Sequence, residues 1–388
     1  MNDFIFRMPT RVIFGAGAVK QVPSLCKDQG FTKVFVVTGM TSTRKSPHLL
    51  ELLDILHVNG IKTQVFSDVE PDPSVETVDK GAAELTAFGA DAVIAFGGGS
   101  PMDAAKSMSM VSANGGSIIE YMRVRKVYSK RGVPLICITT TAGTGSEVTA
   151  AAVTTDKSTQ EKIGVGHDFQ MPAYAIIDPV LHVSMPPSVT AATGLDALTH
   201  AIEAYIALKS NPVTDGLALT AIRMIGGSLR SACALGDNLE ARSNMALASM
   251  IAGGSFTNAG LGAVHGIAHP VGAQFGTAHG VANGIILPYV MDYCLMANYA
   301  KFREIAAALG KNVSGLTDRE AAGLSVEAVR ELKADVGIPA SLADIGVPAS
   351  AVESIVKDAV TFRMLGNSPR RLTAADLRII VKNALGIS

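Results

Sequence analysis

Four of the eight histidines of this 388-residue chain fall in two short stretches near its middle. One stretch is Asp196-Ala-Leu-Thr-His200, and the other is His265-Gly-Ile-Ala-His269, followed ten residues later by His279. Residues four apart on a helix leave the same face, so each stretch is expected to pair its two polar side chains. A carboxylate and several imidazoles without a thiolate suit Fe(II), Zn or Mn. The sequence therefore predicts a divalent transition-metal site.

Two features near these histidines bear on the helices that carry them. Thr277 is a candidate N-cap, so His279 is expected near the start of a helix. Pro270 is expected to kink or end the helix of His265 and His269. A glycine inside a helix costs roughly 1 kcal/mol relative to alanine. Close approach of another segment or of a ligand would explain the glycines that recur here at every fourth position, namely Gly272, Gly276, Gly280 and Gly284.

A glycine loop in the first half of the chain predicts phosphate binding. It follows the apolar run Ala92–Phe96 and precedes the helical pattern Pro101–Val111, which includes Asp103. Glycines let the main chain approach a pyrophosphate closely, and a helix N-terminus offers free N–H groups and a partial positive charge. A tight turn between strand and helix is the alternative interpretation. The loop residues are Gly97, Gly98, Gly99 and Ser100.

A second polar loop, residues 139–147, follows the next apolar run. Its hydroxyls and glycines include Thr140, Thr141 and Thr144. Open α/β sheets bind ligands beyond the carboxyl ends of their strands, so both loops are expected to line one crevice. An earlier run ends at Gly39, where an acid would commonly hold the adenosine ribose, and Arg44 and Lys45 follow. Without that acid, a ribose 2′-phosphate would not be repelled, so the choice between NAD and NADP is open.

Apolar runs alternate with helical patterns up to about residue 180, which indicates a parallel sheet covered on both faces. The expected strands are Val34–Thr38, Thr63–Phe66, Ala92–Phe96, Leu135–Thr140, Lys162–Gly166 and Ala173–Ile177, and the expected helices are Leu49–Val58, Ser74–Phe88 and Pro101–Val111. From Pro186-Pro187-Ser188 onward the sequence is rich in helix formers and shows no convincing strand. We therefore expect an α/β dinucleotide-binding domain at 1–183 and an all-helical metal-binding domain at 184–388.

Composition argues against several classes of protein. The formal net charge is −1 and the pI about 6.7, whereas a nucleic-acid-binding protein would show a basic stripe. The four cysteines are far apart and form no CxxC, which is typical of a reduced, cytoplasmic protein. No signal peptide and no membrane-length apolar run is evident. We therefore expect a cytoplasmic protein without nucleic-acid or membrane partners.

Taken together, these motifs resemble the iron-containing (group III) alcohol dehydrogenases over essentially the whole chain. The resemblance rests on residues 97–106, residues 139–147, Gly194–His200 and residues 265–280. It implies a Rossmann-like domain, a helical domain and an active site in the cleft between them. It implies NAD or NADP as cofactor with Fe(II), or alternatively Zn, and self-association as a homodimer.

The same resemblance implies roles for individual residues. The metal ligands would be Asp196, His200, His265 and His279, whereas His269 would lie beside the metal as a catalytic residue and proton relay. Phe256 and Phe362 are candidates for the substrate wall, with plain core as the alternative. Ser368 interrupts the usual Asn-Pro-Arg of the tail, so Arg370 is expected to be displaced. The cofactor contacts would be Gly39, Gly97, Gly98, Gly99, Ser100, Asp103, Thr140, Thr141, Thr144 and Lys162.

The expected function is hydride transfer between NAD(P) and a small primary alcohol or aldehyde, such as a short alcohol, a diol, lactaldehyde or a small acidic aldehyde. Glycerol-phosphate dehydrogenases and dehydroquinate-synthase-like lyases share the architecture and are the alternatives. Maleylacetate reductases also resemble it, but they do not carry the metal ligands. A non-catalytic metal- or nucleotide-binding protein is a further alternative.

Overall fold

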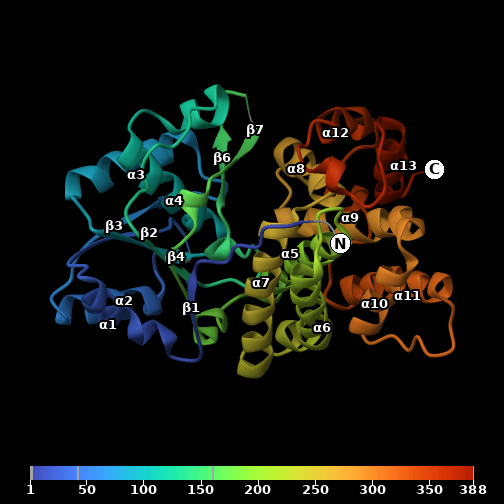
Figure 1. The fold of residues 1–388 in the computed structure, drawn as a ribbon, viewed down its shortest axis with the longest axis horizontal. Coiled ribbons are helices and arrows are strands. Elements are labelled where there is room, and N and C mark those ends of the chain that lie inside the picture. The colour runs from blue at the N-terminus through green and yellow to red at the C-terminus, as the bar shows by residue number, and fades with distance from the viewer. Residues whose placement is uncertain (1–2, 42, 160, 388) are drawn as a thin grey trace. The chain divides into compact units, whose positions relative to one another are not determined.

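The computed structural model describes residues 3–41, 43–159 and 161–387 (Figure 1). The chain forms two compact units. The sheet unit consists of Met8–Thr141 and Ser146–His182. The helical unit consists of the N-terminal segment up to Arg7, the short stretch Ala142–Gly145 and the chain from Val183 onward.

The sheet unit is built on six parallel strands in the order β1-β8-β5-β4-β2-β3. The strands are β1 (Arg11–Phe14), β2 (Lys33–Gly39), β3 (Lys62–Val69), β4 (Ala92–Gly97), β5 (Leu135–Thr139) and β8 (Tyr174–Ile177). The helices of this unit are α1 (Val22–Gln29), α2 (Pro47–Val58), α3 (Val75–Phe88) and α4 (Gly99–Asn114). A separate antiparallel pair consists of β6 (Ala151–Asp156) and β7 (Glu161–Gly166).

The central strands are apolar on both faces because helices cover both. On β2, Phe35 and Val37 join the core formed with α3 and α4, whereas Val34 and Val36 join the core formed with α1 and α2. The two helical layers lie on opposite sides of the sheet in Figure 1. This explains why these strands read as unbroken apolar runs, and it confirms the predicted parallel sheet.

The predicted strands and helices of the sheet unit are all present, with ends that differ by at most three residues. Three elements were missed, namely β1, α1 and β6. β1 is a four-residue edge strand whose burial does not follow a repeating pattern. α1 has only eight residues and carries Pro23 in its first turn. Short elements of this kind give too few periods of an apolar pattern to be recognised.

The helical unit contains no strand among its described residues, as expected. Its first long helix begins at Pro187, where proline fits because the first helical N–H needs no partner. Figure 1 shows these helices from yellow-green to red. They are α5 (Pro187–Ile206), α6 (Pro212–Ala234), α7 (Leu239–Ala259), α8 (Ala263–Phe275), α9 (His279–Cys294), α10 (Tyr299–Ala308), α11 (Asp318–Asp335), α12 (Val352–Ala359) and α13 (Ala374–Leu385).

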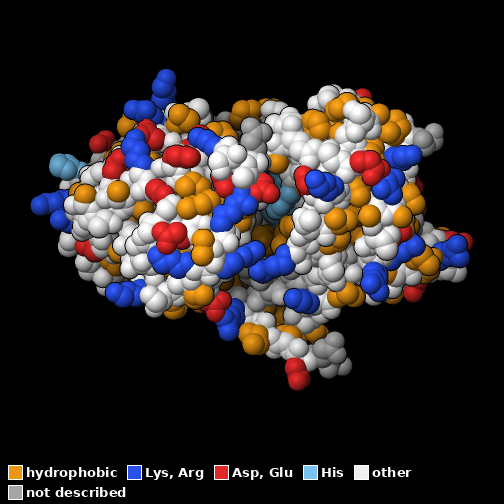
Figure 2. Space-filling model, turned by 90° about the horizontal axis from the view of Figure 1, so that it is seen from above, with side chains coloured by type: hydrophobic (Ala, Val, Ile, Leu, Met, Phe, Trp, Pro, Cys, Tyr) orange, Lys and Arg blue, Asp and Glu red, His pale blue; other side chains and the backbone are white. Residues whose placement is uncertain are grey.

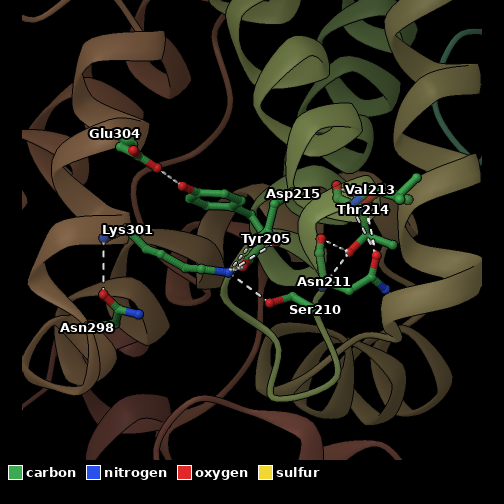
Figure 3. A network of polar contacts seen from close by, with 10 residues as sticks. Tyr205, Ser210, Asn211, Val213, Thr214, Asp215, Asn298, Lys301 and Glu304 are labelled. Atoms are coloured by element: carbon green, nitrogen blue, oxygen red, sulfur yellow. Dashed lines mark hydrogen bonds and ion pairs between the residues drawn. The ribbon is translucent and has the colours of Figure 1, made fainter. Parts of the chain in front are cut away.

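A lysine ties three of these helices together (Figure 3). Lys301 of α10 donates to the carbonyl of Tyr205 at 2.6 Å, to the hydroxyl of Ser210 at 2.7 Å and to the carboxylate of Asp215 at 2.9 Å. The Tyr205 hydroxyl in turn donates to the carboxylate of Glu304. The end of α5, the start of α6 and α10 are therefore held by one ammonium group.

Replacing Lys301 with methionine is expected to destabilise the helical unit by about 2 kcal/mol. The change keeps the bulk of the side chain but leaves the partly buried Asp215 carboxylate and the Tyr205 carbonyl without this donor. Urea unfolding followed by circular dichroism measures the loss. The control is Lys311→Met, because Lys311 pairs with the exposed Glu327 and Glu331 and such pairs contribute at most about 1 kcal/mol. Equal losses in both variants would contradict the prediction.

The surface is mixed in charge. Lys and Arg side chains alternate with Asp and Glu on the face drawn in Figure 2. The basic residues of the 123–131 segment fit this pattern, because Arg123 pairs with Asp156 and Glu161, and Lys126 pairs with Glu120. Among the described residues, one helical segment, His279–Ala297, has the length and hydropathy of a membrane span, but 61% of it is buried within the protein. Core helices of soluble proteins share that property.

Candidate metal centre and cofactor-binding loops

Three helices of the helical unit bring the predicted metal ligands together. α5 carries Asp196 and His200 one turn apart, α8 carries His265 in its first turn, and α9 begins at His279. Donor atoms of Asp196, His265 and His279 all lie within 4.8 Å of one another. His200 Nε2 lies 4.0 Å from Asp196 Oδ1, and His279 Nε2 lies 3.7 Å from the same oxygen. Two ligands at about 2.1 Å from one cation lie at most about 4.2 Å apart, so the separations of 4.0 and 3.7 Å fit a shared ion.

One local prediction around this site was wrong, and another is narrowed. Of the two effects predicted for Pro270, a kink or the end of the helix, the second does not occur, because α8 continues to Phe275 with the proline inside it. Thr277 is not the N-cap of α9, because the N-cap is Ala278 and its side chain makes no capping hydrogen bond.

The expected close approach of glycines is found at two positions of α9. A Cβ at Gly280 would lie 2.1 Å from the Ala192 carbonyl, and one at Gly284 would lie 2.8 Å from the Leu195 side chain. These glycines let α9 pack directly against α5, which brings His279 to Asp196. Gly276 has a different role, because it ends α8 in a left-handed conformation with φ +65°.

Two acceptors fix the orientation of the imidazole rings. His265 Nδ1 lies 2.6 Å from Glu203 Oε2, and His200 Nδ1 lies 3.2 Å from the carbonyl of Gly143. Each contact is best made by a protonated Nδ1, which leaves the lone pair of Nε2 for a metal. The donor set therefore matches a resident divalent cation in its chemistry as well as in its spacing.

Asn283 lies among the donor atoms. Its Nδ2 is 2.7 Å from Asp196 Oδ1, 3.2 Å from His265 Nε2 and 3.1 Å from His279 Nε2. The side chain is fully buried, and its Oδ1 has no hydrogen-bond partner among the described residues. The shortest contact is to the carboxylate, so the amide orients Asp196 toward the histidines.

Burial and mutual charge set the protonation of this cluster. Burial lowers the pKa of His200 and, more strongly, that of His265, so both rings are neutral near pH 7. Burial by itself raises the pKa of Asp196, but positive charge on His200, His279 or His265 and the hydrogen bond from Asn283 lower it below its ordinary value. A carboxylate beside neutral imidazoles is the protonation state that a metal requires.

Aromatic rings surround the histidines. Phe256 of α7 stacks on His200 with ring centres 4.4 Å apart, and Phe362 meets His269 edge-on at 5.1 Å. The His269 ring lies 5.4 Å from that of His279. Phe256 and Phe362, the two predicted candidates for the substrate wall, therefore contact His200 and His269, respectively.

In the sheet unit, several of the predicted cofactor residues lie at the carboxyl ends of β2, β4 and β5, namely Gly39, the glycine loop, Thr140 and Thr141. Chain order along the sheet reverses between β2 and β4, and Gly39 and the glycine loop follow these two strands. Such a reversal is where open α/β sheets bind ligands. α4 begins at Gly99, and its N-cap, Gly98, makes no side-chain capping bond. Its first N–H groups are therefore available to a phosphate.

The glycine loop leaves no room for side chains. Gly97 has φ +151°, and a Cβ there would lie 2.8 Å from Pro101. A Cβ at Gly98 would lie 2.9 Å from the hydroxyl of Thr141, and the Thr140 N–H donates to the Gly97 carbonyl at 3.0 Å. These glycines therefore let Pro101 and Thr141 pack against the main chain, and what the loop offers a pyrophosphate is the N–H groups at the start of α4.

Other predicted cofactor residues already have protein partners. The Asp103 carboxylate accepts from Ser146 at 2.7 Å and from the N–H of Val153 at 2.9 Å, and burial raises its pKa. Asp103 thus ties α4 to the second loop and to β6. Lys162 donates to Asp72 at 2.7 Å, and the Asp72 N–H donates to Ser100 at 3.3 Å.

The second loop is divided between the units. Thr140 and Thr141 belong to the sheet unit, whereas Thr144 lies within Ala142–Gly145 of the helical unit. There a Cβ at Gly143 would lie 2.7 Å from Thr193, and the Gly143 carbonyl accepts from His200. A loop that the sequence suggested only for the cofactor therefore also orients a metal ligand.

Sequence reasoning missed Glu203 and Asn283. The signal was spacing, because Glu203 lies seven residues after Asp196 on the same face of α5, and Asn283 lies four residues after His279 on α9.

At the tail, Asn367 donates to the carbonyls of Ala259 and Leu261, and Arg370 donates to the carbonyl of Tyr293.

Comparison with known proteins agrees with this picture. Residues 9–179 match the model of the iron-containing alcohol dehydrogenases, and residues 190–385 match that of the C-terminal part of the same family. The chain is 40% identical over 382 residues to the NAD-dependent methanol dehydrogenase of Bacillus methanolicus, covering 98% of this chain and 99% of that protein. It is 39% identical over 369 residues to the lactaldehyde reductase of Escherichia coli K12, covering 94% and 95%.

A solved 1,3-propanediol oxidoreductase superimposes with a TM-score of 0.96 at 37% identity, covering 99% of this chain and all of the other. Matches of this length and identity carry the fold and the chemistry together. The chain therefore belongs to the iron-containing alcohol dehydrogenase family and is an NAD(P)-dependent alcohol dehydrogenase or aldehyde reductase of that type.

Proposed function

We propose that the helical unit holds one Fe(II) or Zn ion through Asp196, His200, His265 and His279, and that the sheet unit binds NAD or NADP. We propose the domain boundary that the sequence suggests, between residues 183 and 184, which lies one residue from the start of the main part of the helical unit at Val183. The observation that supports this most strongly is the convergence of Asp196, His265 and His279 from three helices, with their donor atoms within 4.8 Å.

In the proposed reaction, some residues of the chain orient the metal ligands and one transfers a proton. When bound, the metal supplies a Lewis acid that polarises the substrate oxygen, and the nicotinamide exchanges the hydride. Glu203, Gly143 and Asn283 hold the donor atoms in place. His269 lies beside the cluster and moves the proton of the alcohol oxygen, since an imidazole titrates near neutral pH.

Phe256 and Phe362 exclude water from the reacting carbon and favour small, uncharged substrates. Both rings are apolar and contact His200 and His269. We therefore propose a short primary alcohol or diol and its aldehyde as the substrate. The similarity to a methanol dehydrogenase and a lactaldehyde reductase supports this choice over the phosphate-binding branches.

A panel of aldehydes assayed with NADH and NADPH tests the proposal. We expect turnover with short aldehydes and with aldehydes derived from diols. We expect no turnover with glycerol phosphate or with dehydroquinate precursors. Preferred turnover of a phosphorylated substrate would contradict it. We also propose that the protein works in the cytoplasm as a homodimer, which light scattering of the purified chain would check.

Coenzyme choice is proposed to depend on Gly39. The Gly39 N–H donates to the hydroxyl of Thr43 at 3.1 Å, and a Cβ at position 39 would lie 2.9 Å from that oxygen. No carboxylate side chain therefore stands at the end of β2, where it would repel a ribose 2′-phosphate.

Gly39→Asp is expected to lower kcat/KM for NADPH relative to NADH by at least about tenfold, because like charges placed together cost more than about 1.4 kcal/mol. Initial rates with both coenzymes measure the ratio. Gly39→Asn serves as the control, since it adds similar bulk without charge. An unchanged ratio in the aspartate variant, or an equal change in the asparagine variant, would count against a role of charge at this position.

A further inference from the structure

Glu203 is a buried carboxylate next to the metal-binding histidines but outside the ligand set. It lies on α5 on the same face as Asp196 and His200, and only 3% of it is exposed. A carboxylate in such a place is costly unless each oxygen has a hydrogen-bond donor. The partners of its two oxygens therefore show what it does.

The two oxygens of Glu203 have different partners. Oε1 accepts from the backbone N–H of Val264 at 2.7 Å, in the first turn of α8. Oε2 lies 2.6 Å from Nδ1 of His265, one residue further along. One oxygen thus stabilises the start of α8, where free N–H groups favour an anion, and the other faces the ring.

We propose that Glu203 is a positioning residue that holds His265 in the tautomer protonated at Nδ1, so that the Nε2 lone pair is free for the metal. In its ionised form Glu203 can only accept hydrogen bonds, so the 2.6 Å contact then requires a proton on Nδ1 of His265. The inference rests on the proposed metal site and adds the group that prepares one of its ligands.

Replacing Glu203 with glutamine separates positioning from packing. The amide has the same shape, but it presents one acceptor and one donor group. The glutamine oxygen must face the backbone N–H of Val264, because the glutamine NH₂ group is itself a donor and cannot pair with another donor. Its NH₂ group then faces Nδ1 of His265, which must become an acceptor, so the proton moves to Nε2. The variant should therefore fold but carry a proton on the atom that ligates the metal.

Metal affinity and tautomer state are both measurable without turnover. The full-length chain, stripped of metal, is titrated with Co(II) and Zn(II), and the dissociation constant of Glu203→Gln is expected to rise about 10- to 100-fold. Two-bond ¹H–¹⁵N spectra of histidine-labelled, metal-free protein report the tautomer directly. His265, assigned by the loss of its signals in His265→Ala, is expected to be protonated at Nδ1 in the wild type and at Nε2 in Glu203→Gln.

Controls distinguish the possible failures. Glu304→Gln makes the same change at a carboxylate of α10 that accepts from the hydroxyl of Tyr205, which lies on α5 as Glu203 does. This variant is expected to bind metal as the wild type does. Absence of metal binding by the wild type would refute the proposed metal site itself. Wild-type affinity in Glu203→Gln, or a wild-type His265 protonated at Nε2, would refute the role of Glu203. The wild-type spectrum decides the matter even if the variant does not fold.

Discussion

His265→Ala is expected to remove bound metal and lower kcat by about 10³-fold or more. His265 is 2% exposed, and one of its ring nitrogens is among three donor atoms that lie within 4.8 Å of one another. Its removal leaves an incomplete set of ligands and also frees Glu203 from its partner. Metal assistance contributes several kcal/mol to reactions at carbonyl and alcohol oxygens, and about 4 kcal/mol corresponds to 10³ in rate. Metal content by mass spectrometry and steady-state rates measure the two losses together.

The matched control for this variant is His57→Ala. His57 is an exposed residue of α2 in the sheet unit and has no place in the proposed chemistry. This variant should keep both metal and turnover. Circular dichroism of His265→Ala should show wild-type helix content, since α8 still begins at the same backbone positions. Full turnover by His265→Ala in the absence of metal would remove His265 from the mechanism.

His269→Ala is expected to keep the metal and lose rate by about 10²- to 10⁴-fold, the usual contribution of a positioned acid or base. Its ring lies 5.4 Å from that of His279 and 6.2 Å from that of His265, and it is not one of the three clustered donors. Without the imidazole, the proton of the alcohol oxygen would have to be transferred to water. The loss should fall on kcat with little change in metal content.

A pH–rate profile distinguishes proton transfer from simple packing for His269. Loss of one limb of the wild-type profile in His269→Ala is expected, and added imidazole should restore part of the rate. His269→Phe controls for bulk, because it keeps an aromatic ring against Phe362 but cannot carry a proton. A phenylalanine variant as active as the wild type, or a metal-free alanine variant, would show that the assigned role is wrong.

The sequence predicted elements correctly where the repeat of apolar or polar residues extends over several periods of a strand or helix. The parallel sheet followed from apolar runs such as β2, whose residues face helical layers alternately. The grouping of Asp196 with His200 followed from a spacing of four on a helix. The short edge strand β1 and the eight-residue helix α1 offered no such repeat.

Contacts distant in sequence were beyond the reach of pattern alone. Glu203 pairs with His265 across 62 residues, and Gly143 meets His200 across 57. Pro270 lies inside α8, although a proline in a helical pattern often ends the helix. The sequence shows which groups have the right chemistry, whereas tertiary packing decides which of them meet.

The central claim is that one divalent metal, held by Asp196 and three histidines, is required for turnover. Its most direct test is metal analysis of anaerobically purified full-length protein, followed by chelation and titration with Fe(II) or Zn(II) while oxidation of a short alcohol is followed through absorbance of the reduced nicotinamide. We predict one metal per chain, loss of turnover on chelation and recovery at one equivalent. Undiminished turnover by protein shown to contain no metal would contradict the account.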